Sequence, residues 1–287
     1  MTLARTTLTL ALVTTVTLSL SAQTAWPQFR GLHGGVAEND PALPETWGPD
    51  DNVVWRIDVP GRGWSSPIVS GEHVFITSVV NTSGVETTLK PLSQYQSRSF
   101  DGPMTGANLE TPLVPLRWML YDVDFETGVI RWERTLHTAT PGSKHEKNSY
   151  ASETPVTDGN RVYVYLGYVG LFAFDLDGTR LWHTPMDAPE MRQGWGTASS
   201  PVMHGDRLFL VNDSLDQSFI AAFDTATGAE AWRVDRDEAS NWSTPFIWQN
   251  DVRTEIVTTG TGGVQSYDLN GRFLWGLEGM SSIHVAT

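Results

Sequence analysis

The sequence predicts an all-β protein, a β-propeller of four-stranded antiparallel blades, because one motif returns along the chain at the spacing of a blade. The motif is an aromatic or aliphatic residue, an Asp, a short turn closed by Gly, and a Trp four residues after that Gly. Successive Trp residues of the motif lie 50, 50 and 43 positions apart, the period of a propeller blade. The Gly and Trp of the four copies are Gly128 and Trp132, Gly178 and Trp182, Gly228 and Trp232, and Gly271 and Trp275.

A second motif has the same period and gives each blade its strands. It is a Ser or Thr followed by Pro, and runs rich in Val, Ile, Tyr and Phe come after it, separated by Gly, Asp and Asn turns. Such runs are typical of short strands joined as hairpins. Pro suits the first residue of a strand because it lacks an N–H. Each unit is therefore predicted to hold two hairpins, with its Trp packed against the neighbouring blade. The motif occurs at Ser66-Pro67, Thr154-Pro155, Ser200-Pro201 and Thr244-Pro245.

The predicted domain organisation has three parts. Residues 1–25 have the features of an export signal, namely an early Arg5, an uncharged apolar run and small residues before Trp26. Residues 26–62 are a lead-in that contains the closing strand of a blade, Asn52–Arg56, around Trp55. Residues 63–287 hold the repeats, with blades at about 63–132, 150–182, 196–232 and 241–275 and the start of a further blade at 280–287.

The predicted ring is incomplete, with about four complete blades. The repeat spacing places the first strand of another blade at the end of the sequence, so the expectation is a truncated product or a gene fragment. The alternative is that subunits associate to cover the open edges, because unpaired edge strands invite association. The first blade also has a long polar insertion between Val79 and Trp118, expected either to shape a binding site or to form a surface flap.

Composition restricts the function classes. The net charge of −14 disfavours DNA and anionic membrane surfaces as partners, so nucleic-acid binding is not expected. The chain has no Cys, which excludes disulfides, thiol nucleophiles and a lipidated Cys. The apolar run near the N-terminus is short and rich in Thr, so no membrane span is expected after signal cleavage, and a retained N-terminal anchor is the alternative. The predicted location is therefore periplasmic or secreted.

The candidate ligand-facing residues lie in the links between the last strand of one blade and the first strand of the next. These links run along one face of a propeller toward its centre, where ligands bind. One link carries Lys147, Asn148 and Glu153, and the next carries Arg192 and Trp195. A solvated loop would have the same polar composition, so that interpretation stays open. The seven His residues are scattered, and the sequence shows no nucleophile elbow or phosphate loop, so no catalytic or metal-binding residue is predicted.

The pattern Asp-x-x-Thr-Gly-x-x-x-Trp, complete at Asp124–Trp132 and Asp224–Trp232, resembles the tryptophan-docking repeat of the pyrroloquinoline quinone (PQQ)-like β-propellers. The stretches Trp26–Gly31 and Gly61–Pro67 resemble an exported bacterial branch of that family. The family includes quinoprotein alcohol and glucose dehydrogenases, which use PQQ and usually Ca²⁺ on an eight-bladed ring. It also includes non-enzymatic scaffolds such as the outer-membrane assembly lipoprotein. No set of Asp, Glu and Asn residues here maps onto the calcium and base positions of the dehydrogenases.

The resemblance leads to two principal function hypotheses. The first is an exported, non-catalytic binding or assembly scaffold whose partner is a cell-envelope protein or a small molecule. The alternative is a PQQ-dependent oxidoreductase of the alcohol or sugar dehydrogenase type, or a fragment of one, in which PQQ would contact Trp195, Arg192, Lys147 or Asn148. A third class, polymer binding, is suggested only by the 12 Trp residues, most of which the repeat already accounts for.

Overall fold

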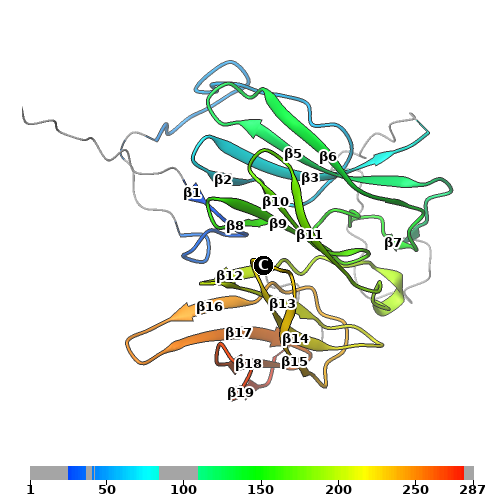
Figure 1. The fold of residues 1–287 in the computed structure, drawn as a ribbon, viewed down its shortest axis with the longest axis vertical. Helices are drawn as coiled ribbons and strands as arrows, with labels where there is room; N and C mark the ends of the chain where they lie inside the picture. Colours follow the sequence, from blue (N-terminus) through cyan, green and yellow to red (C-terminus); the bar gives the residue numbers. More distant parts are fainter. Residues whose placement is uncertain (1–24, 37–40, 42, 84–108, 281–287) are drawn as a thin grey trace, which may run out of the picture.

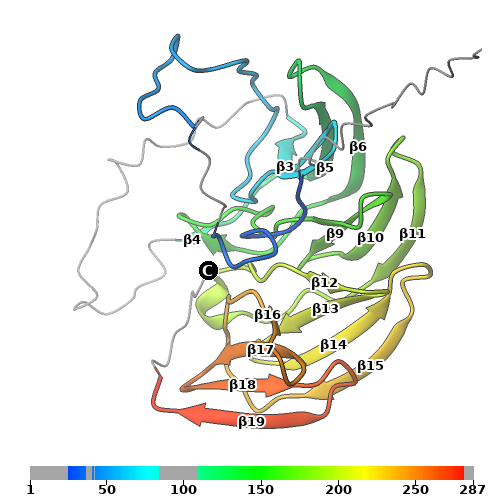
Figure 2. The same ribbon diagram turned by 90° about the vertical axis from the view of Figure 1, so that its left-hand side faces the viewer.

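A computed structural model describes residues 25–36, 41, 43–83 and 109–280 as four successive β-sheets stacked side by side in an arc (Figures 1 and 2). The first and last sheets lie at opposite ends of the stack, and the arc does not close into a ring (Figure 2). The prediction of an incomplete propeller with four complete blades is therefore confirmed. Within the described ranges the only helical element is the 3-10 turn η3 (Arg192–Gly194).

In each sheet consecutive strands pair antiparallel, as the predicted hairpins require. The first sheet has the order β1-β2-β3-β5-β6, with β1 (Ala25–Trp26), β2 (Ile68–Ser70), β3 (His73–Asn81), β5 (Leu116–Asp124) and β6 (Ile130–Ala139). The second sheet holds β8 (Val156–Thr157), β9 (Arg161–Leu166), β10 (Gly170–Asp175) and β11 (Arg180–Pro185). The third holds β12 (Val202–His204), β13 (Arg207–Asn212), β14 (Phe219–Asp224) and β15 (Glu230–Asp235). The fourth holds β16 (Phe246–Gln249), β17 (Thr254–Gly260), β18 (Gly263–Tyr267) and β19 (Phe273–Glu278). A small two-stranded sheet pairs β4 (Leu109–Glu110), at the end of the insertion, with β7 (Lys144–His145).

The Asp and Gly of the repeat make the turn before the last strand of each sheet. In the third sheet, Asp224 Oδ1 accepts hydrogen bonds from the N–H of Ala226 (3.1 Å) and from the N–H (3.0 Å) and hydroxyl (2.9 Å) of Thr227. Asp124 makes the corresponding bonds in the first sheet. Gly228 closes the turn with φ +72°, a left-handed conformation that favours glycine. The copies of the repeated sequence therefore form the same turn in different sheets.

The Trp of each of the first three copies contacts that turn in the next sheet. The indole Nε1 donates to a backbone carbonyl there, from Trp132 to Leu176 (2.8 Å), from Trp182 to Thr225 (3.0 Å) and from Trp232 to Leu269 (3.0 Å). The ring lies against the turn Gly so closely that a Cβ added to Gly228 would be 2.5 Å from the Trp182 ring. Gly is therefore required at this turn for two reasons: the backbone has a positive φ, and a side chain here would collide with the Trp ring.

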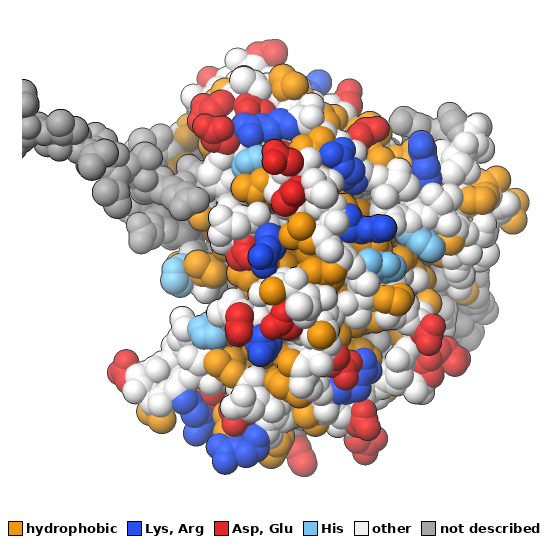
Figure 3. All heavy atoms as spheres, viewed as in Figure 1, with side chains coloured by type: hydrophobic (Ala, Val, Ile, Leu, Met, Phe, Trp, Pro, Cys, Tyr) orange, Lys and Arg blue, Asp and Glu red, His pale blue; other side chains and the backbone are white. Residues whose placement is uncertain are grey.

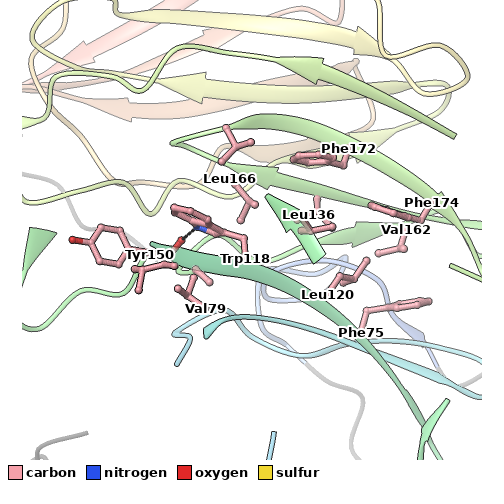
Figure 4. Packing of buried hydrophobic residues seen from close by; sticks show 14 of the residues in the cluster. Phe75, Val79, Trp118, Leu120, Leu136, Tyr150, Val162, Leu166, Phe172 and Phe174 are labelled. Atoms are coloured by element: carbon pink, nitrogen blue, oxygen red, sulfur yellow. Dashed lines mark hydrogen bonds between the residues drawn. The ribbon is translucent and has the colours of Figure 1, made fainter. Parts of the chain in front are cut away.

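Apolar side chains fill the space between successive sheets. Figure 4 shows the first of these layers, where Phe75 and Leu120 of the first sheet face Phe172 and Phe174 of the second. Trp118 lies in the same layer and its Nε1 donates to the carbonyl of Tyr150 (2.7 Å). Two further clusters fill the second and third layers. Burial between sheets, rather than one central core, is what stabilises the stack.

The end of the lead-in, around Trp55 and Pro60, lies against the first sheet. The structure assigns no strand to 52–56, where a closing strand was predicted, because this stretch has no ladder partner. Trp55 nevertheless makes the blade contact, since its Nε1 donates to the carbonyl of Phe125 (2.8 Å) and its ring lies against Gly128. Farther along, the Pro60 carbonyl accepts a hydrogen bond from Ser78 Oγ (2.6 Å). The predicted export signal up to residue 24, the predicted blade start beyond Met280 and most of the insertion lie outside the described residues.

The segment Trp26–Gln28 runs across the inner strands. Trp26 pairs with Val69 of β2, the Pro27 carbonyl accepts from the N–H of Thr157 in β8 (2.9 Å), and Gln28 Oε1 accepts from the N–H of Met203 in β12 (3.3 Å). The Gln28 side chain is buried. This segment therefore satisfies backbone donors of inner strands in three sheets and ties those sheets together.

Candidate functional site

The links that carry the predicted site residues are held in register by the Ser/Thr–Pro motif. The N–H of Ser66 donates to Thr154 Oγ1 (2.9 Å), the N–H of Thr154 to Ser200 Oγ (2.9 Å), and the N–H of Ser200 to Thr244 Oγ1 (3.1 Å). The motif hydroxyls of the second, third and fourth sheets thus each accept a bond from the motif of the preceding sheet. The Pro restricts the Ser or Thr before it to extended backbone, so the four copies enter their strands in the same way.

Asn148 joins its own link to the next one. Its Nδ2 donates to the carbonyls of Trp195 (2.9 Å) and Thr197 (3.1 Å), and its Oδ1 accepts from the Ser149 N–H (2.8 Å) and the Ser152 hydroxyl (2.6 Å). An amide side chain has two donors and two acceptor lone pairs. All four are engaged within the protein, so Asn148 has no hydrogen-bonding capacity left for a ligand in this conformation.

Glu153 is buried beneath the same links. Its carboxylate accepts hydrogen bonds from the Thr197 hydroxyl (2.5 Å) and from the N–H groups of Gly167 (3.3 Å) and Ser152 (3.2 Å). Burial disfavours the charged form and raises the pKa of Glu153, although these three donors oppose the shift. The residue therefore supports the link from inside and does not face solvent.

Trp195 is the ring on which this cluster centres. It lies between His145, at a centroid distance of 5.8 Å, and Trp242, at 5.7 Å. Trp242 Nε1 donates to the Gly196 carbonyl (2.6 Å), which fixes the third link against the second. Burial lowers the pKa of His145. Figure 1 shows β7 and the short helical turn η3, which carry His145 and Arg192, at the same end of the molecule.

The two predicted cationic residues differ from the rest of the set. Lys147 is exposed, and the side chain of Arg192 is partly exposed on η3, whose backbone is tied down by the bond from the Arg192 N–H to Ser240 Oγ (2.8 Å). The structure thus brings Asn148, Glu153 and Trp195 together through Thr197 and the Trp195 carbonyl. It leaves Lys147 and Arg192 as charges at the surface.

A buried charged cluster that joins the third link to the β13–β14 loop was not predicted from the sequence. The side chains of Arg236 and Asp213 have no exposed surface and form an ion pair (Nε to Oδ1, 2.8 Å). Arg236 also donates to Thr258 Oγ1 (2.9 Å) and to the Tyr267 hydroxyl (3.0 Å), and Asn241 donates to Asp213 (3.2 Å). Burial raises the pKa of Asp213. In the sequence Arg236 belongs to a charged run that has the composition of a solvated loop, so no sequence feature indicates that its side chain is buried and paired.

These surroundings do not fit a PQQ and calcium site. A calcium ion needs free oxygen ligands, and the oxygens of Asn148 and Glu153 are committed to internal donors. Both neighbours of the Trp195 ring are side chains of the protein itself. Among the described residues, no three His, Asp or Glu side chains are grouped so that they could hold a metal ion.

Glu153 leads to a prediction for the pH dependence of stability. Because its pKa is raised in the folded state, the stability it contributes is greatest below the ordinary carboxyl value and is lost as pH rises through the raised pKa. We expect Glu153→Gln to remove the contribution of one titrating proton. The slope of the free energy of unfolding against pH should then change by at most about 1.4 kcal/mol per pH unit. Urea unfolding between pH 4 and 8 measures it. Glu126→Gln, at an exposed turn, is the control, and a pH dependence identical in wild type and Glu153→Gln would contradict the prediction.

Comparison with known proteins gives the family. A family model described as Outer membrane protein assembly factor BamB matches residues 45–177, 101–217 and 167–286. The chain belongs to this family. Successive matches overlap by at least the length of one repeat, as expected for a repeat whose copies can be aligned in more than one register. No curated protein matches the sequence.

Solved structures of related fold are BamB-type and PQQ-type propellers. BamB from Moraxella catarrhalis has 15% identity and a TM-score of 0.41, over 57% of this chain and 46% of that one. A europium-containing methanol dehydrogenase has 10% identity and a TM-score of 0.50, over 78% and 42%. Quinohemoprotein alcohol dehydrogenase from Comamonas testosteroni has 12% identity and a TM-score of 0.40, over 61% and 38%. This BamB-family chain spans less than half the length of each, and at such identities the similarity shows the fold alone.

The helices of the described residues and the charges on one face of the molecule bear on membranes and nucleic acids as partners. No helix among them is long and apolar enough to cross a membrane. On the face shown in Figure 3, acidic and basic side chains are interspersed and do not form a basic patch. A nucleic-acid-binding surface would gather Lys and Arg side chains on one face.

Proposed function

We propose that this protein is an exported, non-catalytic scaffold whose link face, the surface around Lys147, Trp195 and Arg192, binds a cell-envelope protein. One observation carries the proposal: the polar groups best suited to hold a small ligand, those of Asn148 and Glu153, are used up in joining one blade to the next. A surface whose internal groups are satisfied is rigid, and a rigid surface loses little entropy when it binds a macromolecule.

The partner and the location follow from the same surface and from the family. Lys147 and Arg192 are cationic groups at the surface of a chain with a net charge of −14, so they favour an acidic segment of the partner. The family description as an outer-membrane assembly factor and the signal-like residues 1–25 support a periplasmic or secreted location. A small-molecule partner remains the alternative occupant of the link face.

The second candidate function is a PQQ-dependent oxidoreductase, or a fragment of one. It is supported by the fold similarity to the europium-containing methanol dehydrogenase, which extends over 78% of this chain. Trp195, Arg192 and Lys147 are the side chains that could contact PQQ, whereas calcium would lack free ligands at Asn148 and Glu153. These residues do not fit PQQ and Ca²⁺ together, and none of them is assigned a catalytic role.

A PQQ titration separates the two functions. We expect no saturable quenching of Trp fluorescence up to about 100 µM PQQ, with or without Ca²⁺, because the neighbours of Trp195 are already in place and PQQ would have to displace them. Equilibrium dialysis and dye-linked alcohol oxidation by the same folded sample complete the measurement. Binding near one PQQ per chain, together with turnover, would overturn the scaffold proposal.

The partner half of the proposal is tested with charge reversals. The tagged chain is cross-linked in envelope extracts of its own source. We expect a defined envelope protein to be captured by the unaltered chain and lost with Lys147→Glu combined with Arg192→Glu. The control is Arg272→Glu, which also reverses a positive charge. Its side chain is 78% exposed and lies just before β19, away from the link face. Equal capture by all three proteins would contradict a role for the link face.

A further inference from the structure

His145 connects its own link to the next one through both its backbone and its ring. It lies on β7, which pairs with β4, and its N–H donates to the carbonyl of Trp195 (3.2 Å). The imidazole meets the Trp195 ring edge to face, with an interplanar angle of 84° and a centroid distance of 5.8 Å. Together with Trp242 it is one of the two ring neighbours that hold Trp195 in the link face.

The imidazole also accepts a hydrogen bond that fixes its protonation state. The N–H of Lys147 donates to His145 Nδ1 (3.1 Å), and the N–H of Asn148 donates to the His145 carbonyl (2.9 Å), so residues 145–148 form a closed turn. A backbone N–H can only donate, so Nδ1 carries no proton here and the ring is neutral. A protonated imidazole has an N–H at both nitrogens and cannot accept. The bond from Lys147 therefore exists only while His145 is neutral.

This turn carries a cation of the link face and the amide that joins the two links. Its last residue, Asn148, donates to the carbonyls of Trp195 (2.9 Å) and Thr197 (3.1 Å). The residue before it is the exposed Lys147. Without an acceptor at the imidazole, the turn loses one of the hydrogen bonds that hold it, and the backbone at Lys147 can leave its present path. The protonation state of one ring therefore bears on the position of Lys147 and on the order around Trp195.

The surroundings of the imidazole determine the pH at which the ring takes up a proton. Burial has the largest effect and lowers the pKa of His145. Two nearby ammonium groups act in the same direction and two carboxylates oppose them, belonging to Lys147, Lys144, Glu146 and Glu110. Lys144 Nζ lies 2.7 Å from Glu110 Oε2, so these two charges offset each other, and the Trp195 ring that faces the imidazole from the next link is uncharged. The ring is therefore neutral at pH 7 and is protonated only below the ordinary value for histidine, about 6.5.

We propose that His145 is a pH-sensitive latch of the link face. With a neutral ring, the bond from Lys147 and the ring contact with Trp195 hold the turn and the aromatic side chain in one arrangement. When the ring is protonated, Nδ1 becomes a donor that faces the N–H of Lys147, so the turn opens or the ring rotates away from Trp195. Because the folded state holds the neutral ring, this order is lost as the pH falls. The link face is the docking surface of the proposed function, and the role of the latch in binding rests on that function.

Two-dimensional NMR of the chain between pH 8 and pH 5 tests the latch without any partner. We expect a single midpoint, below about pH 6.5, for the His145 ring, the Lys147 N–H and the Trp195 indole N–H. Protection of the Lys147 N–H against hydrogen exchange should fall at least about threefold across that midpoint, because its acceptor is lost. Titration of the His145 ring with no change at Trp195 would overturn the proposal, since the bond would then affect its own turn alone.

Two variants separate the acceptor from the ring. In His145→Asn the side-chain oxygen can accept from the Lys147 N–H, as Asn does in turns, but it is not protonated in this range, so the Lys147 signal should lose its pH dependence. His145→Phe keeps an aromatic ring beside Trp195 without an acceptor, so protection of the Lys147 N–H should be low at every pH. The control is His33→Asn, at an exposed residue of the lead-in, which should titrate like the wild type.

The outcome of the variants decides the proposal. A pH dependence of the Lys147 N–H that persists in His145→Asn would overturn it, because a group other than His145 would then be responsible. Loss of the pH dependence in His145→Asn and not in His33→Asn would support it. These measurements use the chain alone, so they separate a failure of the latch from a failure of the link face to bind an envelope protein.

Discussion

Gly228→Ala is expected to lower the free energy of unfolding by about 3 kcal/mol or more, although it adds a single methyl group. About 1 kcal/mol comes from holding Ala at φ +72°. The larger share comes from the Cβ, which would lie 2.5 Å from the Trp182 ring and 2.7 Å from Thr184 Oγ1, so the ring would have to leave its place between the second and third sheets. Urea unfolding followed by Trp fluorescence measures the change.

The third sheet contains its own control. Gly205 also has a left-handed backbone, φ +60°, but a Cβ there would meet nothing within 4 Å. Gly205→Ala should therefore cost only the backbone share, about 1 kcal/mol. The difference between the two variants measures the contact of Trp182 with the turn. Equal losses at Gly228 and Gly205 would mean that the contact does not contribute to stability.

Arg236→Met is expected to lower the free energy of unfolding by about 3 to 5 kcal/mol at pH 7, because it leaves Asp213 charged and unpaired in the interior. The loss should shrink as the pH falls toward 4. The pKa of Asp213 is raised by burial and rises further without the guanidinium. A carboxyl with a raised pKa costs stability progressively as pH rises from its ordinary pKa to the raised pKa, and costs nothing below the ordinary value. Urea titrations at pH 4.5 and pH 7 check both the size and the sign.

Two further variants distinguish a buried ion pair from a general effect of losing an Arg. Arg272→Met removes an ion pair whose Arg side chain is 78% exposed, and should cost less than about 1 kcal/mol at either pH. Asp213→Asn in the Arg236→Met background should recover part of the stability at pH 7, because it removes the buried charge. A loss for Arg236→Met that does not depend on pH, or no recovery with Asp213→Asn, would contradict the explanation.

The repeat made most of the fold predictable. The strands of a blade are neighbours in sequence, so the turn residues and the alternation of apolar positions determine them locally, and four copies reduce the chance of a misread turn. Asp224, Gly228 and Trp232 are found in the roles that such a turn requires. The stretch around Trp55 was predicted as a strand because it has the composition of one. It lacks ladder pairing because no described strand lies beside it.

The candidate site was less predictable, because its residues are defined by partners in the next link, about 45 positions away. Asn148 and Trp195 were selected for being polar or aromatic in a link, and the structure does place them together. The sequence could not show that the amide of Asn148 is fully used by Trp195, Thr197 and its own loop. Their part in ligand binding stays a prediction. Arg236 was missed because a charged run has the same composition whether it is solvated or paired.

The sequence by itself determined the fold class, the four blades of this chain and the packing of each repeat Trp against a neighbouring blade, because these follow from the period and the turn chemistry. Only the tertiary structure decided which polar groups are free. Hydroxyls of the Ser/Thr–Pro motif and the Glu153 carboxylate find partners across a sheet boundary. The Arg236 guanidinium joins Asp213 of its own sheet to Thr258 of the next sheet. Whether such a group binds a ligand or its own protein depends on distances of about 3 Å, and the stacking of the sheets sets those distances.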